Sequence, residues 1–117
     1  MKFQRDKYRC TEADLLGEFY FQARCAGLEV YLEVKLPSPV HRCGEMRVDA
    51  VVVDGDEILC CVEAKREGRA VDTNARQIRA YSALERDYRV QTIWINSVVG
   101  IPQVVASIIA LKRKEAA

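Results

Sequence analysis

The stretch MRVDAVVVDGDEILCCVEAK, residues 46–65, specifies the central part of the fold because two apolar segments flank a tight-turn signal. Residues 46–53 and 57–65 are rich in valine and other apolar side chains, which favours β-strands. Between them, the sequence Asp54-Gly55-Asp56 is typical of a hairpin turn. We therefore predict an antiparallel β-hairpin in this stretch.

The hairpin carries charges where a buried strand would carry apolar residues. Because side chains alternate between the two faces of a strand, one face of the first strand should carry Arg47, Asp49, Val51 and Val53. By the same rule, one face of the second should carry Glu57, Leu59, Cys61, Glu63 and Lys65. Counting from Gly55 as the centre of the turn predicts that Asp49 lies opposite Cys61, with Glu63 a diagonal neighbour at about 7–8 Å.

Two carboxylates at that separation can hold a divalent cation between them. Without a cation, their like charges would repel and raise one pKa. Alternatively, Glu63 and Lys65 are only the solvated end of a strand. The same Glu-x-Lys pattern recurs at Glu33-Val34-Lys35, so the tripeptide alone is not specific.

The rest of the chain predicts one helix before the hairpin and further elements after it. A helix capped by Thr11 should end at Gly27, and residues 28–36 should form a strand. A helix over 71–87, with Asp72 as a candidate cap, a strand over 90–96 and a helix over 101–114 should follow. The order αβββαβα predicts a single α/β (α+β) domain over 1–117, with a mixed four-stranded sheet flanked by helices.

The composition is that of an ordinary globular protein. The 117 residues are 50% hydrophobic and 30% charged, with a net charge of +1, so any DNA-binding surface would have to be local. Five cysteines without a CxxC pair argue against disulfides or zinc and favour buried free thiols in a reducing cytoplasm. The chain shows no signal peptide, no apolar run near the roughly 18 residues of a membrane span, and no GxxxxGK[ST] nucleotide loop. We expect a soluble cytoplasmic protein.

A third acid falls on the apolar face of the first helix. On a helical wheel, Glu12 is centred among Leu15, Leu16 and Phe19. A carboxylate that points into a core is costly unless it is paired or binds a metal. Two alternatives stay open: Glu12 only caps the first turn, or Glu18, at the edge of the stripe, is the functional acid.

The second helix offers polar and basic candidates. Gln77 and Tyr81 lie four residues apart and share one helix face, although a glutamine is more often a surface residue. Arginines on or just before this helix could contact phosphates, together with Arg42 in the loop before the strand that carries Asp49: Arg66, Arg69, Arg76, Arg79 and Arg86. The outer ones could instead form a solvated face of the helix.

In this order and spacing, the residues resemble the PD-(D/E)XK nuclease superfamily, with its restriction-endonuclease-like fold. The matching positions are Glu12, Asp49 in MRVDAVVV, Glu63 and Lys65 in CVEAK, and Gln77 in RQIRAY. The pattern looks most like the amino-terminal nuclease domain of type I restriction motor subunits, and it is also similar to virus-type replication-repair nucleases and archaeal Holliday junction resolvases. One departure is Val48, which precedes Asp49 where the family pattern has proline.

The resemblance implies a metal-dependent DNA endonuclease that hydrolyses phosphodiester bonds. Mg²⁺ or Mn²⁺ would be held by Asp49, Glu63, the carbonyl of Ala64 and Glu12, with Lys65 beside the metal-bound water and Gln77 in a positioning role. DNA would be bound by Arg42, Arg66, Arg69, Arg76 and Tyr81. A homodimer or a partner subunit is expected, with no membrane and no nucleotide cofactor. The alternative is a non-catalytic nucleic-acid-binding or assembly module on the same fold.

Overall fold

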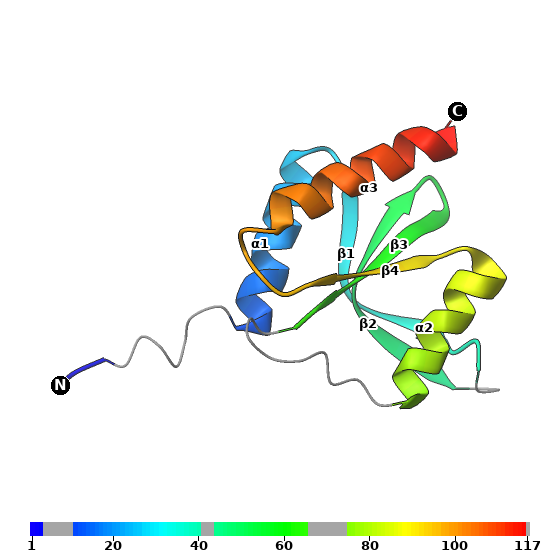
Figure 1. Cartoon of the computed structure of the whole chain (residues 1–117), viewed down its shortest axis with the longest axis horizontal. Coiled ribbons are helices and arrows are strands. Elements are labelled where there is room, and N and C mark those ends of the chain that lie inside the picture. Colours follow the sequence, from blue (N-terminus) through cyan, green and yellow to red (C-terminus); the bar gives the residue numbers. More distant parts are fainter. Residues whose placement is uncertain (4–10, 41–43, 66–74, 117) are drawn as a thin grey trace.

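The computed structural model describes residues 1–3, 11–40, 44–65 and 75–116, and it confirms the predicted order of elements (Figure 1). The elements are α1 (Glu12–Cys25), β1 (Glu29–Pro37), β2 (Glu45–Asp54), β3 (Glu57–Ala64), α2 (Ala75–Tyr88), β4 (Gln91–Ile95) and α3 (Ile101–Ala116). The predicted start of the second helix, from Val71 with Asp72 as its cap, lies outside the described residues.

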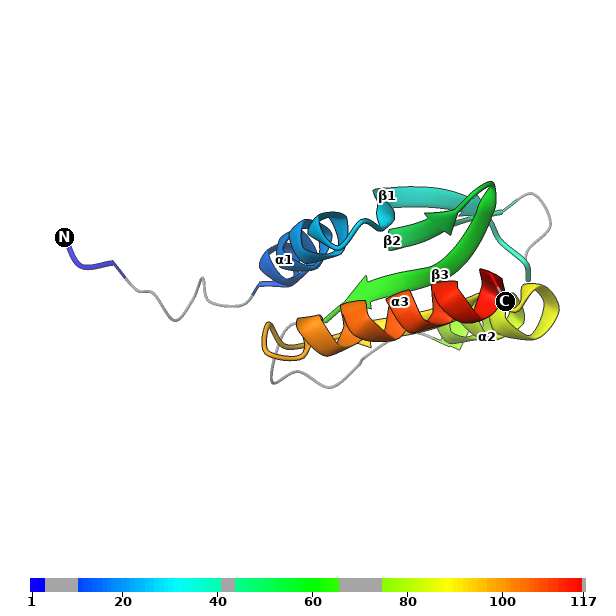
Figure 2. The same ribbon diagram turned by 90° about the horizontal axis from the view of Figure 1, so that it is seen from above.

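The four strands form one mixed sheet in the order β1-β2-β3-β4. The pairs β1–β2 and β2–β3 are antiparallel, whereas β4 runs parallel to β3. A parallel neighbour requires a crossover connection, and α2 lies within it. Helices α1 and α3 cover one face of the sheet and α2 covers the other, which gives three layers (Figures 1 and 2).

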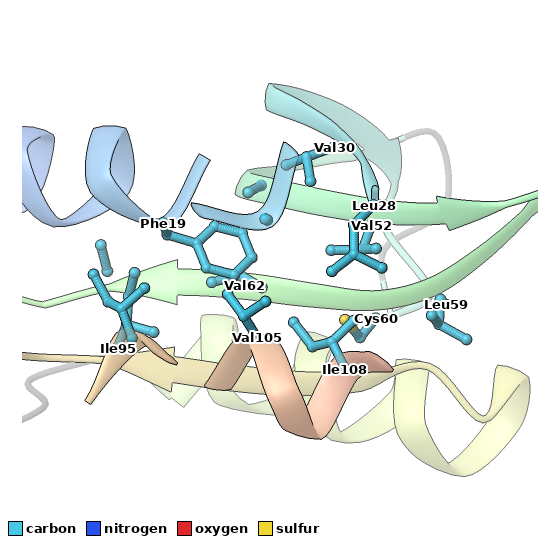
Figure 3. Close-up of a cluster of buried hydrophobic side chains, with 14 of the residues drawn as sticks. Phe19, Leu28, Val30, Val52, Leu59, Cys60, Val62, Ile95, Val105 and Ile108 are labelled. Carbon is cyan, nitrogen blue, oxygen red and sulfur yellow. The ribbon is translucent and has the colours of Figure 1, made fainter. Parts of the chain in front are cut away.

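The first core lies between the sheet and the pair α1 and α3 (Figure 3). Thr11 and Asp14 form a reciprocal capping box at the start of α1. The buried residues of this helix follow at four-residue intervals, which is the period of one helix face. The first core comprises Leu15, Phe19, Ala23, Leu28, Val30, Ala50, Val52, Leu59, Cys60, Val62, Ala64, Ile95, Ile101, Val105 and Ile108.

The second core lies on the opposite face, under α2. It is smaller and comprises Met46, Val48, Val51, Cys61, Ala80, Tyr81, Leu84 and Val90. Trp94 of β4 is partly buried against it. Residues of β3 enter both cores, so this strand is covered on both faces and presents few side chains to solvent.

The predicted hairpin is present, but its register differs from the prediction. Ala50 pairs with Val62, so Asp49 lies opposite Glu63 and not opposite Cys61. Part of the difference comes from the turn, since Asp54 pairs with Glu57 around a loop of which Gly55, at φ 64°, is the first residue.

A β-bulge accounts for the rest of the difference in register. The pairs Val52–Cys60 and Val53–Ile58 leave Leu59 as an extra residue on β3. Leu59 and Cys60 therefore both enter the first core, and Ile58 packs against the second. The expectation that Leu59 shares a face with Glu63 was wrong, because strict alternation does not hold across a bulge.

A second irregularity lies beside Asp49. In β1, Glu33 has φ 52° and falls between the pairs Leu32–Ala50 and Val34–Val48. On β2, Val48 joins the second core, whereas Ala50 joins the first. Regular alternation would have put the side chains of Val48 and Ala50 in the same core. The alternation of side chains along β2 is therefore interrupted at Asp49.

The cysteines meet the expectation only in part. Cys60 and Cys61 are free and buried, and burial raises the pKa of each thiol to about 12. Cys25 is also free but is exposed, contrary to the expectation of buried thiols. Cys10 and Cys43 lie outside the described residues.

None of the helices in the described ranges combines the length and apolar character that a membrane crossing needs.

Candidate active site

Asp49 and Glu63 hold one another in place across the β2–β3 pair. The backbone N–H of Asp49 donates to Oε1 of Glu63 at 3.1 Å, and the N–H of Ala64 donates to Oδ2 of Asp49 at 2.9 Å. Each carboxylate thus accepts a backbone hydrogen from the opposite strand, just beyond the last regular pair. The two acids come together as predicted, but they lie directly opposite each other on the two strands and not diagonally.

Glu63 is buried to an unusual degree for an acid. Its side chain is only 4% exposed, and it is the one charged residue counted as buried in the part of the chain that the structure describes. Besides the N–H of Asp49, its Oε1 accepts the hydroxyl hydrogen of Tyr81, which reaches over from α2. Such a group is tolerated in a core when its hydrogen-bonding capacity is used.

Burial and charge change the proton affinity of Glu63. Burial is the main cause that raises its pKa, from 4.5 to about 7, and the neighbouring Asp49 carboxylate adds to the increase. The hydrogen bonds from Tyr81 and from the Asp49 backbone act in the opposite direction because they favour the ionised form. Glu63 therefore exchanges its proton near neutral pH, where a bound cation could replace it.

Tyr81 was expected at a nucleic-acid surface, and that expectation was wrong. Its side chain is 6% exposed, and its hydroxyl is committed to Glu63. Burial and the Glu63 carboxylate raise the pKa of Tyr81, while a hydrogen bond with the Gln77 side chain lowers it. Gln77 is thus linked to Glu63 through Tyr81. The four-residue spacing of Gln77 and Tyr81 was the signal in the sequence, but the sequence did not show which strand they face.

Lys65 follows β3 directly and is half-buried. Its backbone N–H donates to the carbonyl of Ile95 at 2.9 Å, which continues the contact with β4 by one residue. Since Ala64 enters the first core, alternation puts Lys65 on the Glu63 face of the strand. The sheet therefore fixes the backbone of Lys65 beside the two acids.

Glu12 does not point into the core as expected; it is exposed. It is the first residue of α1, and a helical side chain leans toward the helix amino terminus, which carries it past the buried part of the stripe. Glu18, the other candidate, is half-buried and accepts a hydrogen bond from Gln22 at 2.9 Å. Within the described ranges, no three acids, histidines or cysteines come close enough to form a metal-binding group.

Most of the predicted basic surface cannot be placed. Arg42, Arg66 and Arg69 lie outside the described residues, as does the side chain of Arg76. Two further arginines of α2, Arg79 and Arg86, are exposed, and Arg86 pairs with its neighbour Asp87 at 2.9 Å.

The donor set fits one hard divalent cation. Mg²⁺ is commonly bound in proteins by one or two carboxylates, with water and substrate phosphate completing its shell. Asp49 and Glu63 supply two adjacent carboxylates, and both hydrogen bonds to Glu63 described above use Oε1. The pKa of Glu63 is raised mainly by burial, with a smaller contribution from the neighbouring Asp49 carboxylate, so a bound cation would favour the ionised form of this acid.

Replacing Tyr81 with phenylalanine should raise the pKa of Glu63 further. The hydroxyl of Tyr81, which phenylalanine lacks, stabilises the ionised carboxylate by a hydrogen bond. We also expect a loss of roughly 1–3 kcal/mol in the free energy of unfolding at pH 8, because a buried acceptor loses a partner. The Glu63 carboxyl carbon, followed by NMR against pH, reports the first effect. Tyr88→Phe is the control, since Tyr88 is 66% exposed. An unchanged titration in Tyr81→Phe would contradict the assigned hydrogen bond.

Comparisons with protein families, curated proteins and solved structures give no significant match.

Proposed function

We propose that this protein is a metal-dependent DNA endonuclease of the PD-(D/E)XK type, acting alone or as a subunit. The observation that carries the proposal is the reciprocal pair of Asp49 and Glu63, with Lys65 directly after the end of β3. A buried acid is costly on a purely structural sheet, where an apolar residue of similar size is often as stable or more stable, so its retention here supports a functional role.

Each residue has a distinct proposed role. Asp49 and Glu63, with the carbonyl of Ala64, hold Mg²⁺ or Mn²⁺. When bound, the metal supplies Lewis acidity and lowers the pKa of a coordinated water. The ammonium group of Lys65 stabilises negative charge that develops on the scissile phosphate. Gln77 and Tyr81 hold Glu63 in position, which supports the positioning role first assigned to Gln77.

The substrate and setting follow from the same proposal. Phosphodiester DNA is the anionic partner, and the arginines that bind it are Arg42, Arg66, Arg69 and Arg76. We also propose a cytoplasmic location. We further propose a homodimer or a partner subunit, because one small domain offers little surface for DNA. Glu12 is left out of the proposed ligands, because within the described residues no third acid joins Asp49 and Glu63.

One observation favours the competing function, a non-catalytic nucleic-acid-binding or assembly module. Only two carboxylates come together in the described part of the chain, where a third was expected. A module of this kind would bind DNA without cutting it and without requiring a cation, so metal dependence separates the two functions.

Cleavage of linear duplex, single-stranded and four-way-junction DNA in Mg²⁺ or Mn²⁺ tests the proposal. We expect Asp49→Asn and Lys65→Ala each to reduce the cleavage rate by about 10²–10³-fold, as for the loss of one electrostatic contact in a transition state. Asn keeps an oxygen that can accept the Ala64 N–H, so the strand pair is preserved. Asp56→Asn, an exposed acid of the turn, is the matched control.

Calorimetry with Mn²⁺ on the same samples separates the outcomes. If the parent binds Mn²⁺ and Asp49→Asn does not, the result supports the cation site even when none of the chosen DNAs is a substrate. Cleavage that survives Asp49→Asn, or a parent that neither cuts DNA nor binds Mn²⁺, contradicts the proposal.

A further inference from the structure

Trp94, the single tryptophan of the chain, lies directly beside Glu63. The two residues are partners in the parallel register of β3 and β4. Trp94 is half-buried and packs against the second core, on the face of the sheet that α2 covers. Its place beside Glu63 cannot be read from the sequence, because the register of two strands separated by a helix depends on how that helix packs.

The indole of Trp94 contacts the residue that holds Glu63. The ring centroids of Trp94 and Tyr81 are 5.9 Å apart and their planes are at 87°, an edge-to-face arrangement. Such pairs are attractive because the positive edge of one ring meets the negative face of the other. Tyr81 belongs to α2, and its hydroxyl donates to a carboxylate on β3. The Tyr81 ring therefore has to stay at a fixed position above the sheet for its hydroxyl to reach Glu63.

This contact limits how the Tyr81 hydroxyl can approach Glu63. The Tyr81 hydroxyl and the Asp49 N–H both use Oε1. A Tyr81 ring free to rotate about its side-chain bonds could lose the carboxylate or move to Oε2. Edge-to-face packing against Trp94 restricts that rotation, since the neighbouring strand fixes the backbone of Trp94 beside Glu63.

We propose that Trp94 is a positioning residue of the cation site: by restraining the Tyr81 ring, it keeps the hydroxyl on Oε1 of Glu63 and leaves Oε2 for a divalent cation. This inference rests on the proposed function only in requiring that Asp49 and Glu63 bind a cation. It differs from simple core packing because it depends on an aromatic ring at position 94 and acts through Tyr81.

Mn²⁺ affinity of the full chain, measured by calorimetry, tests the inference. We expect Trp94→Leu to weaken Mn²⁺ binding by about 10-fold, the lower end of what loss of an outer-shell partner causes. Trp94→Phe, which is smaller than the parent residue but keeps an aromatic ring, should retain most of the affinity. Trp94→Ile is a second non-aromatic variant that suits a strand if the leucine variant does not fold. Val105→Ala, in the first core, controls for a general loss of stability.

A double-mutant cycle then asks whether Trp94 acts through Tyr81. In the Tyr81→Phe background, Trp94→Leu should have little further effect on Mn²⁺ affinity, because the hydroxyl that Trp94 positions is already gone. Additive effects of the two substitutions, or equal losses in Trp94→Phe and Trp94→Leu, would overturn the inference. So would unchanged affinity in Trp94→Leu while the parent binds Mn²⁺, a result that leaves the proposed function intact. A parent that binds no Mn²⁺ overturns both.

Discussion

Replacing Glu63 with glutamine should make the metal-free protein more stable above pH 7, by up to about 3 kcal/mol in the free energy of unfolding. The parent buries a carboxylate whose pKa is raised from 4.5 to about 7, mainly by burial. Glutamine keeps an oxygen that can accept from the Asp49 N–H and the Tyr81 hydroxyl, but it carries no charge to bury. A gain in stability on removal of an acid is the signature of a group retained for function.

The direction of the pH dependence follows from linkage. Between about pH 4.5 and 7 the folded protein keeps a proton on Glu63 that the unfolded chain releases. The contribution of Glu63 to stability is therefore complete below pH 4.5, decreases as the pH rises to about 7, and stays at its lower value above that. The glutamine variant lacks this decrease.

Urea unfolding of parent and variant at pH 5 and pH 8 measures the effect. The advantage of Glu63→Gln should be larger at pH 8, and Mg²⁺ should reduce it because the cation stabilises only the parent. Glu57→Gln, at an exposed acid on the same strand, is the control. The same advantage at both pH values would show that Glu63 ionises in the folded protein like an exposed acid.

Replacing Phe19 with alanine should reduce the free energy of unfolding by about 3–5 kcal/mol, the usual cost of removing a buried aromatic ring. Phe19 is completely buried and lies at the centre of the first core, between α1 and the sheet (Figure 3). The loss should affect the fold far more than the chemistry of the site, since Glu63 and Tyr81 lie on the other side of β3.

Phe21→Ala is the matched comparison, because Phe21 lies on the same helix but is 63% exposed. We expect this second substitution to change the free energy of unfolding by no more than about 0.5 kcal/mol. Urea unfolding measures both. Similar losses in the two variants would mean that the buried face of α1 is wrongly assigned.

Local signals were sufficient for most of the fold. The turn at Asp54-Gly55-Asp56, the capping box of Thr11 and the runs of valine each specify a nearby backbone conformation, and the order αβββαβα followed from them. The approach of Asp49 to Glu63 was also predictable, because both lie on one hairpin whose turn limits how far they can separate.

The predictions from the sequence were wrong where the position of a residue depends on another helix or strand. The bulge at Leu59 changed the register, and the first-turn position of Glu12 carried it out of the core. Tyr81 was assigned to the wrong environment because the helical period shows which residues share a face but not what covers that face.

Local sequence is enough to predict the order of the helices and strands, the hairpin and its pair of acids, because these depend on local backbone preferences and short connections. Three features become visible only in the folded protein: α2 packs over Glu63, Tyr81 donates its hydroxyl hydrogen to Glu63, and Trp94 lies beside both residues. These contacts join segments far apart in the chain, and their geometry depends on how the layers pack together.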